Sequence, residues 1–234
     1  MRAAVLIIGS LYWRPGNRAA WRNDRLNFAR EQHVQVPIRY RRLSQNQTYT
    51  MAFACRGFGV AVAVPCRRLI RNFGALLEEA QQLWKAEDSN AHDSGAISKN
   101  WGAVGVLFRR GLKRGEIANA WAKYCEKHMV EPSGRTFISD KGALEISWPK
   151  TTAGEPVDFD LLFGTGNVAH NPIAFTVAKA WMEHGEEEYF FKNVAAGIHT
   201  PLDTAIWQCL SGKRWPKKYH RAIDALRKQK APQH

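Results

Sequence analysis

The sequence predicts an α+β protein in which strands dominate the first two thirds and helices the last third. As far as residue 163, alternating or short continuous apolar runs outnumber segments of helical spacing, whereas beyond residue 173 apolar residues recur at helical spacing. Segments of the two kinds are grouped along the chain, which favours an α+β layout over a regular alternation of strand and helix. Hydrophobic residues make up 45% of the 234 residues, enough to form a core.

The first predicted strand is the continuous apolar run Ala3–Ile8, which Gly9 and Ser10 end in a tight turn. The run is much shorter than the roughly 20 residues of a membrane span, and no small-residue cleavage site follows it. We therefore expect a buried strand and no membrane association. The polar, Arg-rich segment Asn17–Glu31 predicts a short helix or a surface loop.

Further strands are predicted where apolar residues alternate or cluster over five to nine positions. They are Val34–Arg42, Thr48–Ala54, Gly59–Pro65, Trp101–Arg109, Thr136–Asp140, Ala143–Trp148 and Phe159–Phe163. Alternation in the first of these places Tyr40 and Arg42 on one face. The turn Asp140–Gly142 is expected to join the fifth and sixth of them.

Helices are predicted where apolar residues recur every three or four positions, with the polar segment Asp88–Lys99 as a loop. They are Ile70–Glu87, Gly115–His128, Ile173–His184, Tyr189–Gly197, Leu202–Leu210 and Tyr219–Gln229. We expect one domain over residues 1–212 and a basic helix or tail over residues 213–234.

The composition restricts the class of function. A formal net charge of +13 predicts an anionic partner, either a small acid or a polyanion. The phosphate-binding motif G-x-x-x-x-G-K-[ST], the dinucleotide motif G-x-G-x-x-G after the first strand and the zinc motif H-E-x-x-H are all absent. The four cysteines form no C-x-x-C pair, which predicts a reduced, cytoplasmic protein without disulfides. We expect no metal and no cofactor.

Five motifs, taken in order, resemble the ChaC-like γ-glutamylcyclotransferases. That family opens with a strand and a Gly-Tyr-Gly-Ser-Leu-x-Trp turn, followed by a Tyr-Ser-Arg-Arg-Phe stretch, a Trp-Gly-Val-x-Tyr strand with a helix ending in Arg-Glu-Lys, a strand ending in Gly-Thr, and a Glu-Tyr-Leu-Phe helix. The similar segments here are residues 7–13 (IIGSLYW), 39–44 (RYRRLS), 101–102 (WG) with 125–127 (CEK), 161–165 (LLFGT) and 188–191 (EYFF). Ile7 and Ile8 depart from the Gly-Tyr that opens the family's turn.

The resemblance implies a small mixed β-barrel of the γ-glutamylcyclotransferase-like type, flanked by helices. It also implies a reaction in which the α-amine of a γ-glutamyl compound attacks its own γ-carbonyl, giving 5-oxoproline and a free amine. Glu126 takes the position of the family's catalytic glutamate, as general acid and base. We expect burial against Trp121 and Tyr124 to raise the pKa of Glu126 toward the working pH. The substrate is glutathione or another γ-glutamyl amine or amide.

Seven residues are implied to bind the substrate. The turn offers backbone amides for the α-carboxylate of the substrate or for the developing oxyanion. Arg41 or Arg42 could form an ion pair with a second carboxylate of the substrate. Tyr189 is a candidate wall of the pocket. The full set is Ile8, Gly9, Ser10, Leu11, Arg41, Arg42 and Tyr189.

An alternative is a family relative that has lost the reaction and binds nucleic acid or another polyanion. This hypothesis depends on the basic residues after residue 212, among which Trp215 and Tyr219 are interleaved. Such a segment would bind phosphates with a steep salt dependence.

Overall fold

The structure is a computed structural model that describes residues 1–88, 95–111, 115–129, 136–212 and 214–229. It contains a mixed seven-stranded sheet with the order β6-β7-β9-β1-β5-β2-β8. The strands are β1 (Ala3–Ile7), β2 (Gln32–Val36), β5 (Gly59–Pro65), β6 (Ser98–Lys99), β7 (Gly102–Phe108), β8 (Lys150–Thr151) and β9 (Leu161–Asn167). The predicted α+β class is confirmed. The sheet is open, ending at β6 and β8, so the predicted closed barrel is not confirmed.

Strand β1 lies at the middle of this sheet. It pairs antiparallel with β5 and parallel with β9, in a register that places Ala3 opposite Leu161 and Val5 opposite Phe163. All five residues of β1 and all seven of β9 are buried. A strand covered on both faces needs a continuous apolar run, which is the pattern that the sequence of β1 shows.

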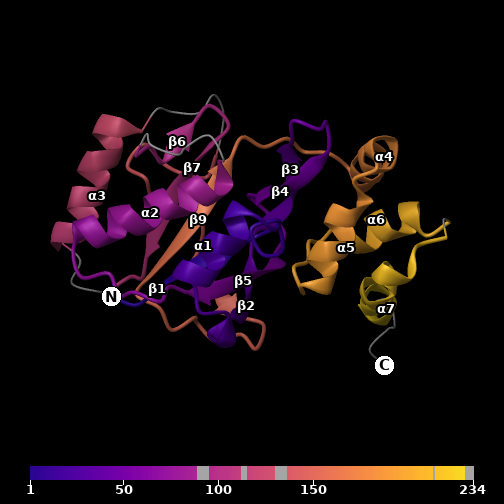
Figure 1. The fold of residues 1–234 in the computed structure, drawn as a ribbon, viewed down its shortest axis with the longest axis horizontal. Coiled ribbons are helices and arrows are strands. Elements are labelled where there is room, and N and C mark those ends of the chain that lie inside the picture. The colour runs from indigo at the N-terminus through magenta and orange to yellow at the C-terminus, as the bar shows by residue number, and fades with distance from the viewer. Residues whose placement is uncertain (89–94, 112–114, 130–135, 213, 230–234) are drawn as a thin grey trace.

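Seven α-helices are described. They are α1 (Asn17–Arg25), α2 (Phe73–Glu87), α3 (Gly115–His128), α4 (Ala174–His184), α5 (Glu187–Ala195), α6 (Asp203–Leu210) and α7 (His220–Gln229). In Figure 1, α1 and α2 lie in front of the sheet, and α4 to α7 gather at the right, beyond the hairpin of β3 (Ile38–Leu43) and β4 (Tyr49–Phe53). In the described part of the chain, no helix has the length and apolar character that crossing a membrane requires.

The single strand predicted over Val34–Arg42 is two strands. Pro37 separates them because it has no backbone N–H for a sheet hydrogen bond. The predicted shared face of Tyr40 and Arg42 is also wrong, because a bulge shifts the register between them. An extra residue at a bulge reverses the alternation beyond it, so Tyr40 is fully buried and Arg42 turns to a different environment.

The strands predicted at Thr136–Asp140 and Ala143–Trp148 are wrong. This region forms only isolated bridges, Ile138 with Leu144 and Ala143 with Val106. Phe137 has a φ of 62°, a left-handed conformation that interrupts an extended run. The predicted turn is present, since Gly142 donates its amide to the Ser139 carbonyl over 2.9 Å.

Phe191 is the centre of the aromatic packing among the C-terminal helices. Its ring stacks on Tyr219 with centroids 4.4 Å apart and meets Trp215 edge-on at 4.8 Å. In α7, Ala222, Ile223 and Leu226 are buried. The described part of the segment 213–234 therefore packs onto α5 through an apolar face.

Phe191→Ala should lower the free energy of unfolding by about 3–5 kcal/mol, because it removes a fully buried ring and leaves a cavity. Phe175→Ala is the matched control: its ring is 59% exposed, so a change within about 0.5 kcal/mol is expected. Urea unfolding followed by circular dichroism measures both. Equal losses for the two variants would contradict the packing of α7 on α5.

Candidate functional site

The turn that follows β1 presents backbone amides to a pocket. It is closed by hydrogen bonds of 2.9 Å from the Tyr12 amide to the Gly9 carbonyl and from the Arg14 amide to the Ser10 carbonyl. The amides of Gly9, Ser10 and Leu11 have no acceptor among the residues that the structure describes. All three residues line a small inner pocket. Consecutive amides without protein acceptors are a common anion-binding arrangement.

Side chains from three distant parts of the chain hold this turn in place. Arg22 donates to the Leu11 carbonyl over 2.6 Å, Tyr12 donates to Glu31 over 3.1 Å, and the Trp13 indole donates to the buried Asn193 over 2.8 Å. Arg22 lies on α1, Glu31 lies directly before β2, and Asn193 lies on α5. The amides are therefore held in position before any ligand arrives.

Gly9 is required by a close approach of Tyr189. The Tyr189 hydroxyl lies 2.5 Å from the point that a Cβ at position 9 would occupy, so any side chain there would collide with it. This hydroxyl accepts a hydrogen bond of 3.0 Å from the Met51 amide, and Tyr189 is only 7% exposed. Tyr189 is therefore both a wall of the pocket and a part of the core.

Glu87, the last residue of α2, lines the same pocket. One carboxylate oxygen accepts a hydrogen bond of 2.9 Å from the Thr165 hydroxyl, and the other lies 3.3 Å from the Arg18 guanidinium. The side chain is only 13% exposed. The sequence carries a signal for it: Glu87 follows Leu83 and Trp84 by four and three residues, which places it on the apolar face of the helix.

Arg42 brings a positive charge to the pocket. Its guanidinium lies 4.5 Å from the centre of the Trp101 ring, which in turn stacks on Trp84. Burial and neighbouring arginines lower the pKa of Arg42, and Glu87 opposes that shift. Among the described residues no carboxylate lies within ion-pair distance of it. Since a guanidinium stays protonated in proteins, this is a half-buried charge without a counterion.

An outer pocket of about 600 Å³ continues from the inner one toward the surface. Five residues line both, and they include the carboxylate, the guanidinium and the phenol described above. They are Ser10, Arg42, Thr50, Glu87 and Tyr189. The site is therefore large enough for a small polar molecule that carries charges of both signs.

Six of the seven residues predicted to bind substrate line these pockets: Ile8, Gly9, Ser10, Leu11, Arg42 and Tyr189. Arg41 does not. It is 9% exposed, and it donates to the carbonyls of His170 over 2.7 Å and Phe53 over 3.0 Å. Of the two arginines left open by the sequence, Arg42 belongs to the pocket and Arg41 joins β3 to the segment before α4.

The structure does not bring Glu126 into the site. Glu126 lies on α3, where its side chain is 47% exposed and its carboxylate lies 3.5 Å from the Lys141 ammonium. The expected burial against Trp121 and Tyr124 is wrong, because five residues along a helix place Glu126 about 140° around the axis from Trp121. Cys125, four residues from Trp121, is the side chain that is buried there.

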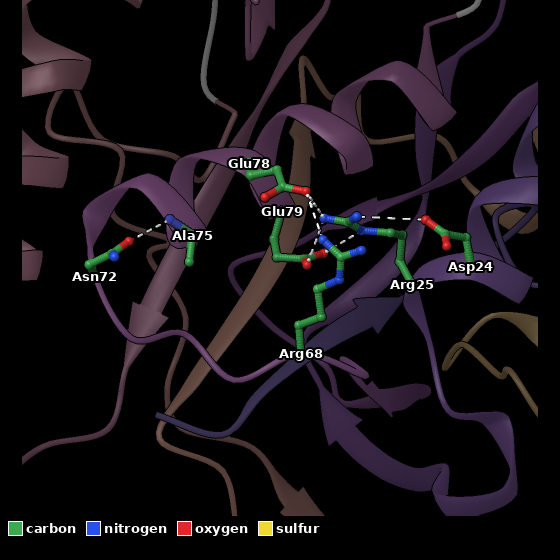
Figure 2. Close-up of polar contacts among 7 residues, drawn as sticks. All are labelled: Asp24, Arg25, Arg68, Asn72, Ala75, Glu78 and Glu79. Atoms are coloured by element: carbon green, nitrogen blue, oxygen red, sulfur yellow. Dashed lines mark hydrogen bonds and ion pairs between the residues drawn. The ribbon is translucent and has the colours of Figure 1, made fainter.

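A buried ion pair fixes the helix that carries Glu87. Arg25 of α1 is 6% exposed and Glu79 of α2 is 5% exposed, with nitrogen–oxygen distances of 2.9 and 3.2 Å (Figure 2). The more exposed Glu78 also accepts from Arg25, over 2.6 Å. Arg18 meets Glu87 at the other end of the same two helices. Paired charges at both ends of α1 therefore join it to the middle and to the C-terminal end of the antiparallel helix α2.

Within the described ranges, no group of three or more His, Cys, Asp or Glu side chains could hold a metal ion. Comparison of the chain with protein-family models, with curated proteins and with solved structures finds no match. The function must therefore be argued from the geometry of the pocket together with the resemblance in the sequence.

Glu79→Gln should lower the free energy of unfolding by about 3 kcal/mol, because it leaves the buried Arg25 guanidinium without its best partner. Glu78→Gln, at a position whose side chain is 48% exposed, should cost less than about 1 kcal/mol. Chemical denaturation of both variants makes the measurement. A larger loss for Glu78→Gln than for Glu79→Gln would show that the buried pair is not what joins the two helices.

The turn should also weaken the protein at alkaline pH. Burial, and then the nearby Glu31, raise the pKa of Tyr12 to about 12 from an ordinary value of 10.0. The unfolded chain then loses this proton first, so the contribution of Tyr12 to stability is complete below pH 10 and is lost as the pH rises to about 12. We expect Tyr12→Phe to lose less stability than the unmodified chain between about pH 8 and 11. Urea unfolding at about pH 8 and 11 measures the change in the free energy of unfolding for both proteins. An equal decrease for Tyr12→Phe and the unmodified chain would rule this out.

Proposed function

We propose that the chain is a γ-glutamylcyclotransferase-like enzyme that binds a γ-glutamyl compound at the Gly9–Leu11 turn and cyclises it to 5-oxoproline. One observation carries the proposal: three amides without acceptors, the unpaired Arg42 guanidinium and the Glu87 carboxylate meet in one pocket. The resemblance in the sequence supplies the reaction. The proposal does not depend on the closed barrel that the resemblance also implies.

The donors of the pocket suit the carboxylate of the substrate. The turn amides and Arg42 offer fixed N–H groups to an anion, and hydrogen bonds to a charged group are stronger than those between neutral groups. Because the turn is anchored by Arg22, Tyr12 and Trp13, little ordering is needed on binding. The same fixed dipoles can stabilise the oxyanion that forms when the γ-carbonyl is attacked.

Glu87 is the carboxylate that we assign as general acid and base. It takes a proton from the α-ammonium of the substrate, whose nitrogen then forms a bond to the γ-carbon. The attacking nitrogen gives up a second proton as the bond from that carbon to the amide nitrogen breaks, and both protons leave with the amine as its ammonium. The products are 5-oxoproline and the free amine, so the step consumes no water and changes no oxidation state.

The partner in this proposal is a small anionic γ-glutamyl substrate, glutathione or another γ-glutamyl amine. The polyanion hypothesis receives less support from the structure, because Trp215 and Tyr219 pack on Phe191. Aromatic side chains that stack on bases must be accessible. The proposed cytoplasmic location rests on the sequence alone.

Glu87→Gln should reduce the release of 5-oxoproline by about a hundredfold or more, because an amide cannot exchange the proton. The measurement is 5-oxoproline formed from glutathione and from a panel of γ-glutamyl amines. Glu126→Gln tests the carboxylate that the sequence resemblance favours, and it should change turnover less than about twofold. Loss of turnover in Glu126→Gln, with Glu87→Gln active, would return the catalytic role to Glu126.

A further inference from the structure

Asn167, the last residue of β9, carries a buried polar group that the proposed reaction does not use. Its side chain is 5% exposed, and the carboxamide oxygen has no hydrogen-bond donor among the described residues. Leaving a buried acceptor without a donor destabilises a fold, so such groups are uncommon. This residue lines the inner pocket with Ser10, Glu87 and Arg42.

The sheet places Asn167 beside the carboxylate. Thr165 and Asn167 are two residues apart on β9, so their side chains leave the same face of the strand. Thr165 donates to Glu87 over 2.9 Å, which puts the carboxylate on this face as well. Glu87 and Asn167 thus both line this side of the pocket, and each carries an oxygen that can accept a hydrogen bond. The turn amides and Arg42 supply the donors of the same pocket.

We infer that Asn167 is a specificity-determining residue whose carboxamide accepts a hydrogen bond from the α-ammonium of the bound substrate. The inference rests on the proposed function and extends it, by assigning to Asn167 the selection of ligands with a free amino group. Glu87 alone offers one charged acceptor, and an ammonium carries three donors. A second acceptor fixes the direction of the amine, and the amine supplies the donor that the Asn167 oxygen lacks.

The test uses two dicarboxylates that differ only in the amino group, L-glutamate and glutarate, neither of which is a substrate for cyclisation with an amine leaving group. Isothermal titration calorimetry on the full chain should give a tighter Kd for L-glutamate by about tenfold or more, the value of a hydrogen bond to a charged group. Asn167→Leu, of similar size, should reduce this ratio by about tenfold and leave the Kd for glutarate within about twofold. Asn167→Asp keeps an acceptor and should keep the preference.

The outcomes separate the two proposals. An unchanged ratio in Asn167→Leu, with normal binding by the unmodified chain, overturns the role of Asn167 and leaves the pocket as a carboxylate site. Weaker binding of both compounds by Asn167→Leu shows a structural role and also overturns it. If Asn167→Leu fails to fold, Asn167→Asp decides the question. Because aspartate keeps the acceptor, loss of the preference for L-glutamate in Asn167→Asp overturns the role of Asn167. Failure of the unmodified chain to bind either compound overturns this inference together with the proposed function.

Discussion

The parallel register between β1 and β9 determines where the site lies. Because Val5 lies opposite Phe163, continuing the register brings the residues after β1 level with Thr165 and Asn167. The turn amides on one strand and the hydroxyl and carboxamide on the other therefore reach the same edge of the sheet. A shift of the pairing by one residue would turn Thr165 and Asn167 to the opposite face, away from Glu87.

Helices α1 and α2 place the Glu87 carboxylate at this edge of the sheet. Their junction is electrostatic at both ends, with Arg25 and Glu79 buried at one and Arg18 with Glu87 at the other. Removing water from two charges costs free energy that their attraction only partly returns, so a buried pair of this kind is a weak source of net stability. The pair instead fixes the orientation of α1 relative to α2, because any other arrangement of the helices would leave the buried Arg25 unpaired. The position of Glu87 thus follows from a contact about two helical turns away.

Much of the fold could be predicted from apolar patterning, since the bounds of β5 and α3 coincide with the predicted segments. The errors have local causes that a pattern of apolar residues does not contain. Pro37 divides a strand, and the bulge after Tyr40 changes which arginine faces the pocket. The turn residues of the site were predicted by their motif, whereas Asn167 required the register between strands that are distant in sequence.

Glu126 and Glu87 show what helical periodicity can and cannot predict about a carboxylate. The motif points to Glu126, but the side chain on the apolar face of its helix is Cys125. The same periodicity applied to α2 places Glu87 with Leu83 and Trp84, and a carboxylate on such a face needs a partner or a function. Periodicity cannot distinguish these two reasons.

The distinction comes from what lies around each acid. Glu79 is surrounded by the donors that neutralise it, whereas Glu87 shares its pocket with groups that no protein partner satisfies. The polar groups of the pocket are arranged by type: N–H donors lie on the Gly9–Leu11 turn and Arg42, and oxygen acceptors lie on α2, where Glu87 already has protein partners, and on β9. A ligand that fits this arrangement must present an anion to one wall and a donor to the other. The α-carboxylate and α-ammonium of a γ-glutamyl group are such a pair, carried on a single carbon atom.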